Sequence, residues 1–165
     1  MVQQLLGHVD GVDEAELRTA LHWAAARSDA SIVNTLLDKI PQLQTFRWPV
    51  NMMHQAAVAG LDDLLVAMML AGCDIDERNH SYWDSTPAAA VAWRGRLSAM
   101  EFLLSLENKP DLSVIDEAGD TALTTAAKRG HPGMVELLLQ GGADITAVGE
   151  DDRSPLQIAV HGYHH

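Results

Sequence analysis

The sequence is short of the features that mark several large classes of protein. It has a single cysteine, Cys73, so no disulfide framework can form within the chain. Aromatic residues make up only 5%, and no apolar run approaches the roughly 18 residues that suggest a membrane-spanning helix. Residues 1–8 lack a basic segment ahead of an apolar one, so they do not resemble a secretory signal. These absences favour a reducing compartment, and we expect an intracellular, cytoplasmic location.

Basic residues are also scarce. Eleven Lys and Arg stand against 23 Asp and Glu, which gives a formal net charge of −12. Nucleic acid is held by clustered Lys and Arg, so it is not an expected partner, and without a spanning segment neither is a membrane. Net acidity by itself is typical of a soluble protein. Apolar residues make up 47% of the 165, enough for a real core.

Residue types used in catalysis and metal binding are present, but not in a recognisable arrangement. The eight histidines have no cysteine partners at zinc-ligand spacing. Cys73 has no evident base or cation beside it. The pair Gly141-Gly142 lacks the following Lys-Ser or Lys-Thr of a phosphate-binding loop. We therefore expect no metal site, no cofactor and no enzymatic activity.

The chain does contain an internal repeat. Each copy begins with a Thr, Ser or Asn that can cap a helix, and a pair of small residues, mostly alanine, follows five and six positions later. The copies begin at Thr19, Asn51, Thr86, Thr121 and Ser154, which are 32, 35, 35 and 33 residues apart. Repetition at this spacing is typical of repeat proteins.

Each copy predicts two helices joined by a tight turn. Gly60, Gly95 and Gly130 follow the first helix and can end it in a left-handed conformation. The second helix has apolar residues at spacings of three and four, as at Leu64 and Met68, which form one apolar face. A helix, a turn and a second helix are therefore expected in every full copy.

These motifs resemble the ankyrin repeat family. The pattern Thr-Pro-Leu-His-x-Ala-Ala, the Gly-His turn, the Leu-Leu-Leu run and the Gly-Ala-Asp exit are most complete in residues 120–144. The resemblance implies an all-α fold, an ankyrin-repeat α-solenoid of antiparallel helix pairs with projecting β-hairpin-like loops. It also implies a non-catalytic protein–protein interaction module that binds a protein or peptide segment through its concave face and loop tips. The histidine of the motif, here His22 and His54, has a structural role in that family.

The repeat pattern also predicts the domain organisation. We expect a single ankyrin repeat domain over residues 1–165, with about four full repeats and a partial repeat at each end. The expected units are 1–16 (partial), 17–48, 49–83, 84–118, 119–151 and 152–165 (partial).

Both ends resemble interrupted repeats, so we expect a piece of a longer protein. Terminal repeats normally carry a polar outer face, which Leu156 and Ile158 do not provide. We therefore expect self-association through the C-terminal repeat. The alternative function is a regulatory or spacer segment that packs against flanking domains of a larger protein.

The partner-binding residues are expected at the two variable positions after each alanine pair, which line the inner groove in the resembled family. Four of the eleven basic residues lie there, namely Arg27, Arg94, Lys128 and Arg129, together with Trp93. No Asp or Glu occupies these positions. An acidic or mixed-charge segment would fit such a groove. Basic residues near the end of a helix can also simply complement its dipole, so both explanations stay open.

The remaining large aromatic residues pose a choice between packing and binding. Tyr82 and Trp83 lie on a lengthened projecting loop and are candidate partner-binding residues. Alternatively, one of them covers the alanine-rich helix that follows. We expect Phe46 and Trp48 to pack beneath an irregular loop, and Trp23 to be partly buried between repeats.

Overall fold

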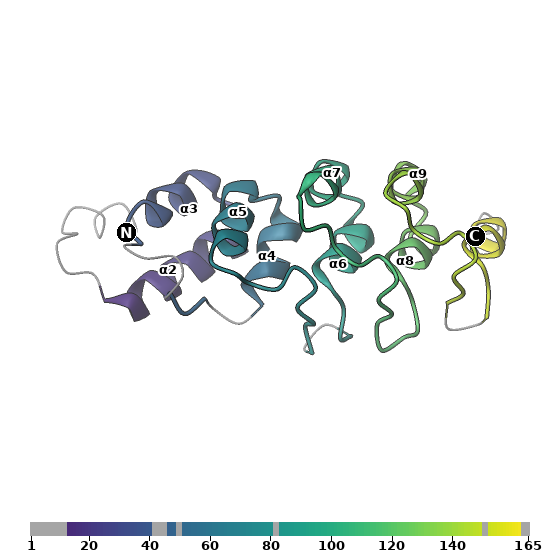
Figure 1. The fold of residues 1–165 in the computed structure, drawn as a ribbon, viewed down its shortest axis with the longest axis horizontal. Coiled ribbons are helices and arrows are strands. Elements are labelled where there is room, and N and C mark those ends of the chain that lie inside the picture. Colours follow the sequence, from purple (N-terminus) through teal and green to yellow (C-terminus); the bar gives the residue numbers. More distant parts are fainter. Residues whose placement is uncertain (1–12, 41–45, 49–50, 81–82, 150–151, 163–165) are drawn as a thin grey trace. The chain divides into compact units, whose positions relative to one another are not determined.

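A computed structural model describes residues 13–40, 46–48, 51–80, 83–149 and 152–162. Within these ranges the regular structure is helical, and the β pairing is limited to one bridge between Asn79 and Ser85 (Figure 1). The expected all-α, helix-pair architecture is therefore confirmed. The chain divides into two compact units, unit 1 (residues 1–73) and unit 2 (residues 74–165), which we describe separately.

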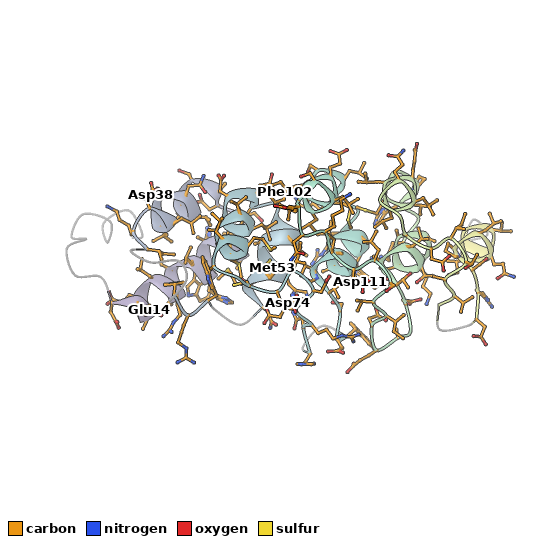
Figure 2. All side chains as sticks on the ribbon, viewed as in Figure 1. Glu14, Asp38, Met53, Asp74, Phe102 and Asp111 are labelled. Carbon is orange, nitrogen blue, oxygen red and sulfur yellow. The ribbon has the colours of Figure 1, made fainter. Side chains whose placement is uncertain are left out.

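Unit 1 contains two helix pairs. Its helices are α2 (Glu14–Ala26), α3 (Ala30–Leu37), α4 (Met52–Ala59) and α5 (Asp62–Leu70). The first helix of each pair packs on its own partner and on the first helix of the other pair, and the second helices also touch. Met53 lies in the core of this unit, whereas Glu14 and Asp38 are on its surface (Figure 2).

Unit 2 repeats the same arrangement and adds one further helix. Its helices are α6 (Pro87–Arg94), α7 (Leu97–Ser105), α8 (Ala122–Lys128), α9 (Pro132–Gln140) and α10 (Pro155–Gly162). Helix α8 packs between α6 and α10 in one layer, while α7 and α9 form a second layer (Figure 1). The loops that precede α6 and α8 extend away from the second layer (Figure 1).

The small residues of the repeat explain how closely these helices approach. In unit 2 the alanine pair of α8, Ala126 and Ala127, is buried, as is the equivalent pair Val91 and Ala92 of α6. Side chains this short let neighbouring backbones come near each other, and longer residues of the second layer, such as Leu103, fill the remaining space.

The ends of the first helices mostly follow the sequence prediction. Gly60, Gly95 and Gly130 have positive φ of +70°, +66° and +68°, as expected for residues that end a helix. The Thr86 and Thr121 hydroxyls accept hydrogen bonds from backbone N–H groups three residues on, so both threonines are the predicted N-caps.

One predicted helix start is wrong, and one predicted side-chain cap is not formed. Thr19 does not begin a helix, because α2 starts earlier, at Glu14, and the Thr19 hydroxyl donates to the Ala15 carbonyl. Acidic residues in the first turn of α2 favour this earlier start through the helix dipole. Asn51 precedes α4 but has a φ of +63° and makes no side-chain cap.

Of the predictions for aromatic residues in unit 1, the one for Phe46 and Trp48 agrees with the structure and the one for Trp23 does not. Phe46 is buried and contacts Trp48 edge to face, with ring centroids 4.9 Å apart, so these two residues pack together as expected. Trp23 was expected to be partly buried, but 63% of it is exposed. Its ring lies edge-on to the His22 ring, with the two ring centroids 6.2 Å apart.

Candidate functional site

The most distinctive surface feature of unit 2 joins two neighbouring repeats. Trp93 lies in the last turn of α6, and Arg129 is the residue that follows α8. The guanidinium carbon of Arg129 lies 3.9 Å from the centroid of the Trp93 ring. This separation is well within the range of a cation–π interaction. Trp93 nevertheless stays 46% exposed, so much of the indole faces solvent.

The turn after α8 holds these two residues together. The His131 Nε2 lies 3.2 Å from the Trp93 carbonyl oxygen, and because that oxygen can only accept, the imidazole N–H donates. The His131 ring also lies against Gly95, where a Cβ atom would come within 2.9 Å of it. The Gly-His turn motif of the sequence contains this residue, although its contact with the neighbouring repeat was not predicted.

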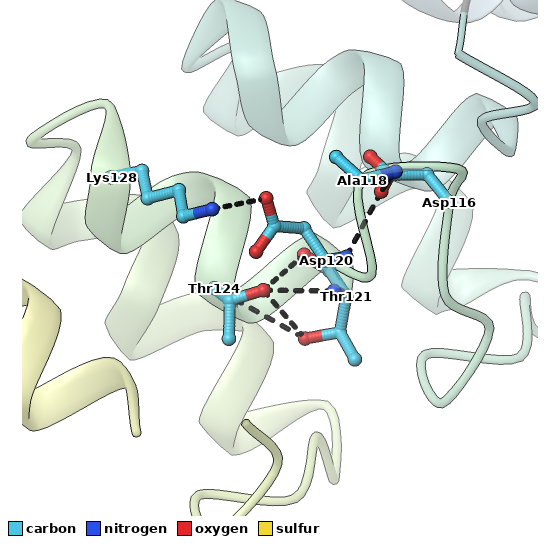
Figure 3. A network of polar contacts seen from close by, with 6 residues as sticks. All are labelled: Asp116, Ala118, Asp120, Thr121, Thr124 and Lys128. Carbon is cyan, nitrogen blue, oxygen red and sulfur yellow. Dashed lines mark hydrogen bonds and ion pairs between the residues drawn. The ribbon is translucent and has the colours of Figure 1, made fainter. Parts of the chain in front are cut away.

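The two other basic residues on this surface have different surroundings. Arg94 is the last residue of α6 and is exposed. The Lys128 Nζ lies 2.6 Å from the Asp120 Oδ2, and only 8% of the Asp120 side chain is exposed (Figure 3). The Lys128 charge is therefore partly neutralised by a carboxylate of its own repeat. The dipole explanation fits Arg94 and Lys128, which end their helices, but it does not account for the stacking of Arg129 on Trp93.

A network of hydrogen bonds fixes Asp120 in front of Lys128. The Asp116 carboxylate accepts from the Ala118 and Asp120 backbone N–H groups, each at 2.9 Å. Thr121 and Thr124 form a reciprocal capping box at the start of α8. Figure 3 shows that Asp116 holds the Asp120 backbone N–H while the Thr121–Thr124 contacts hold the next residue, so the turn and the helix cap together set the position of Asp120.

Trp83 lies on the loop before α6 and is 64% exposed. Trp83 and Asp84 have φ of +57° and +51°, which is unfavourable for side-chain-bearing residues. The Asp84 carboxylate bonds to Arg78 and His80, and the Trp83 carbonyl accepts from the Glu117 N–H of the next loop at 2.9 Å. The hydrogen bond from Arg78 holds the pKa of the Asp84 carboxyl below its usual range.

Two predicted site residues are not placed in this cluster. Arg27 is exposed at the end of α2 and belongs to unit 1. Tyr82 lies outside the described residues. The structure thus brings together Trp93 and Arg129, with Arg94 and Lys128 next to them in the chain.

Other kinds of site find no support in the described part of the chain. It contains no group of three or more His, Cys, Asp or Glu side chains arranged to hold a metal ion. No helix within it combines the length and the apolar character needed to cross a membrane.

Comparison with known proteins gives one family. A model of ankyrin repeats in three copies matches residues 52–149 and 88–165, and a model of a single ankyrin repeat matches residues 16–42. The chain is 40% identical to oxysterol-binding protein-related protein 1 of Rattus norvegicus over 72 residues, 44% of this chain and 8% of that protein.

Two further relatives match over longer stretches of this chain. The chain is 32% identical over 108 residues to the Caenorhabditis elegans homologue of transient receptor potential cation channel subfamily A member 1, which is 66% of this chain and 9% of that protein. It is 31% identical to human NF-kappa-B inhibitor alpha over 99 residues, 58% of this chain and 31% of that protein. The chain thus spans less than a third of the length of each of these three relatives.

Proposed function

Since the chain belongs to the ankyrin repeat family, we propose that it is a protein–protein interaction module that binds through the surface around Trp93 and Arg129. Ankyrin repeats generally mediate binding between proteins and are generally non-catalytic. The family therefore supports the class of function, and the side chains of unit 2 support the place where binding occurs.

The proposed contact surface, called here the basic–aromatic face, consists of Trp93, Arg94, Lys128 and Arg129, with Trp83 on the neighbouring loop. The stacking of Arg129 on the exposed ring of Trp93 is the observation that carries the proposal. Trp and Arg are the residues most enriched at the energetic centres of protein interfaces. Burying the exposed part of an indole under a partner also removes apolar surface from water.

The charge of the face suggests the nature of the partner. The whole chain carries a net charge of −12, yet the variable positions of α6 and α8 hold three basic residues and no acidic one. A segment with acidic or mixed charge is complementary to this face, and electrostatic complementarity favours both the encounter and the choice of partner. Arg27 in unit 1 and Tyr82 stay candidates for additional contacts.

The test is affinity capture with the double variant Arg94→Glu/Arg129→Glu. Proteins bound to the wild-type chain from a lysate of its source cells are identified by mass spectrometry and compared with those bound to the variant. A cytoplasmic location, which we propose from the single cysteine, makes this lysate the relevant source. We expect the proteins bound by the wild type to be lost from the variant.

The matched control is Lys39→Glu/Lys109→Glu. Both lysines are exposed and neither belongs to the face, so this variant has the same change in net charge. We expect it to capture the same proteins as the wild type. Equal capture by all three proteins would contradict the assignment of the face.

A second candidate function is a segment that packs against other domains of a longer protein. The matched region is only 8% of one relative and 9% of another, so ankyrin repeats similar to these do occur within much larger chains. The identity of any further domains in the full-length gene product decides between the two candidates. An interaction of the basic–aromatic face with such a domain, measured with the separate pieces, would favour the second.

We also propose that the chain self-associates through α10. Leu156 and Val160 are 70% and 58% exposed, while Ile158, also predicted to be on the outer face, is buried. The equivalent residues of α8, Leu123 and Ala127, are buried. An apolar helix face of this kind is covered in a stacked repeat, and a second copy of the chain offers the same apolar surface in return.

A further inference from the structure

We propose that Arg129, held against Trp93, is a recognition site for the side-chain carboxylate of an Asp or Glu in a linear segment of the partner. This inference rests on the proposed function and makes it more specific, since it identifies the group that the basic–aromatic face recognises. It concerns the geometry of one arginine rather than the general charge of the face.

The stacked arrangement leaves the hydrogen-bonding groups of Arg129 available. A guanidinium is planar, and its N–H groups point outward in that plane. Its central carbon lies over the Trp93 ring, 3.9 Å from the ring centroid, and among the described residues no hydrogen bond or ion pair uses its side-chain N–H groups. An arginine edge presents two parallel donors that match the two oxygens of a carboxylate.

Arg129 also has no carboxylate partner of its own in the described residues, and the same holds for Arg94. By contrast, Lys128 is paired with Asp120, and Arg78 with Asp84. Among the described residues, some basic groups are thus neutralised internally, whereas Arg94 and Arg129 of this face have no ion-pair partner. In a chain with a net charge of −12, these positions can receive an external carboxylate.

The position of Arg129 is largely fixed before a partner arrives. Its backbone N–H donates to the Thr125 carbonyl at 3.0 Å, which anchors it to the end of α8. The Trp93 carbonyl is held by the His131 N–H, so the platform beneath the guanidinium belongs to the packed contact between two repeats. Less side-chain entropy is then lost on binding than for a freely rotating arginine.

The occupant that fits is an acidic residue beside an apolar one. The carboxylate pairs with the edge of Arg129, and Arg94 adds a second positive charge nearby in the chain. The 46% of Trp93 that stays exposed provides apolar surface for the neighbouring side chain. A lysine at position 129 would keep the charge but would lose both the flat stacking surface and the paired donors.

The probe is a library of random linear peptides with amidated C-termini, selected for binding to the whole chain. Amidation removes the terminal carboxylate, so only Asp and Glu can supply the group. We expect the selected peptides to be enriched in acidic residues next to apolar ones. For a selected peptide we expect Arg129→Lys to weaken binding about tenfold, the value for losing one charge-assisted hydrogen bond.

A double-mutant cycle separates recognition from a general effect on the fold. The peptide is compared with its Glu→Gln form against both the wild type and Arg129→Lys. We expect the Glu→Gln change to weaken binding to the wild type about tenfold, and to weaken binding to Arg129→Lys less, because the lysine keeps its charge but lacks the paired donors. Arg96→Lys, the same substitution at an exposed arginine outside the face, is the control and is expected to bind like the wild type.

Three results would overturn the inference: peptides selected without enrichment in acidic residues, additive effects in the cycle, or binding only of peptides with a free C-terminus. Each is distinguishable from failure of the proposed function. If Arg94→Glu/Arg129→Glu loses its captured proteins while Arg129→Lys binds normally, the face is a binding site that responds only to charge. If neither change alters binding, the face itself is excluded.

Discussion

Lys128 and Arg129 are adjacent, carry the same charge and are both exposed, yet their contacts differ. Lys128 forms an ion pair with the buried Asp120 of its own repeat, whereas Arg129 lies on the tryptophan of the preceding repeat. The sequence places both at variable positions and gives no reason to separate them. We propose that Lys128 contributes mainly to stability and Arg129 mainly to recognition.

The first prediction concerns the pair Asp120 and Lys128. Lys128→Met leaves the Asp120 carboxylate buried without its cation, which we expect to lower the free energy of unfolding by about 1–2 kcal/mol. This is less than for a fully buried pair, because about a third of the lysine side chain is exposed to water. In the double variant Asp120→Asn/Lys128→Met neither side chain is charged. Its loss of unfolding free energy should therefore be smaller than the sum of the losses in Asp120→Asn and Lys128→Met alone. Urea denaturation of the four proteins measures this, and strictly additive losses would show that the pair contributes nothing.

A second prediction concerns Gly149. A Cβ atom there would lie 2.3 Å from the Asp120 Oδ1, and the contacts of Asp120 leave its carboxylate little room to move. We expect Gly149→Ala to lower the free energy of unfolding by about 1–3 kcal/mol, the usual cost of forcing an extra methyl group into a packed site. The matched control is Gly133→Ala in α9, where the nearest atom, 3.3 Å away, belongs to the Leu97 side chain. Since alanine favours a helix over glycine by about 1 kcal/mol, this control should keep or gain stability. Equal urea midpoints for the two variants would contradict the proposed contact.

At the scale of elements, the loop before α6 is held by charge. Trp83 and Asp84 both have positive φ, and the Asp84 carboxylate bonds to Arg78 and His80 across the same loop. The hydrogen bond from Arg78 lowers the pKa of Asp84 in the folded protein. A group with a lowered folded pKa stabilises the fold above its unfolded pKa, and this contribution is lost as the pH falls through the folded value.

Asp84→Asn should therefore destabilise the protein at neutral pH and matter less in acid. We expect the Tm of the variant to lie below that of the wild type at pH 7, and the difference to shrink as the pH falls below the ordinary range of aspartate. Thermal unfolding followed by circular dichroism across this range is the measurement. A difference in Tm that stays constant with pH would mean that the Asp84 charge does not hold the loop.

Local sequence signals predicted the helix pairs of the described residues well. The caps at Thr86 and Thr121 and the left-handed Gly60, Gly95 and Gly130 depend on a few adjacent residues, so a repeat pattern locates them. The start of α2 was missed, because the residues from Glu14 onward favour a helix as strongly as Thr19 favours a cap.

The arrangement of the candidate site was harder to predict. The repeat places Trp93 and Lys128 at equivalent positions, but the Trp93 platform is used by Arg129, one residue further along. That contact depends on how closely the turn at His131 approaches Gly95 in the neighbouring repeat. Such an approach is set by packing between repeats, which the sequence of either repeat alone does not contain.

At the scale of the whole molecule, α10 offers the clearest prediction. Leu156 and Val160 leave an apolar strip exposed on this helix. We expect the average mass of the wild-type chain in sedimentation equilibrium to rise with concentration, and Leu156→Glu/Val160→Glu to stay monomeric, because the charges prevent burial of the strip. Leu70→Glu, at an exposed leucine of α5, is the control and should associate like the wild type. A wild-type chain that remains monomeric at high concentration would contradict self-association.

The central claim is that the basic–aromatic face binds a protein partner. The most direct test is the equilibrium affinity of a partner captured by the wild-type chain, measured by isothermal titration calorimetry. The three proteins to compare are the wild type, Arg94→Glu/Arg129→Glu and Lys39→Glu/Lys109→Glu. We predict a loss of at least about tenfold for the face variant, from the broken charge-assisted contacts, and an affinity close to wild type for the control. Equal affinities for all three proteins, or equal losses in both variants, would contradict the claim.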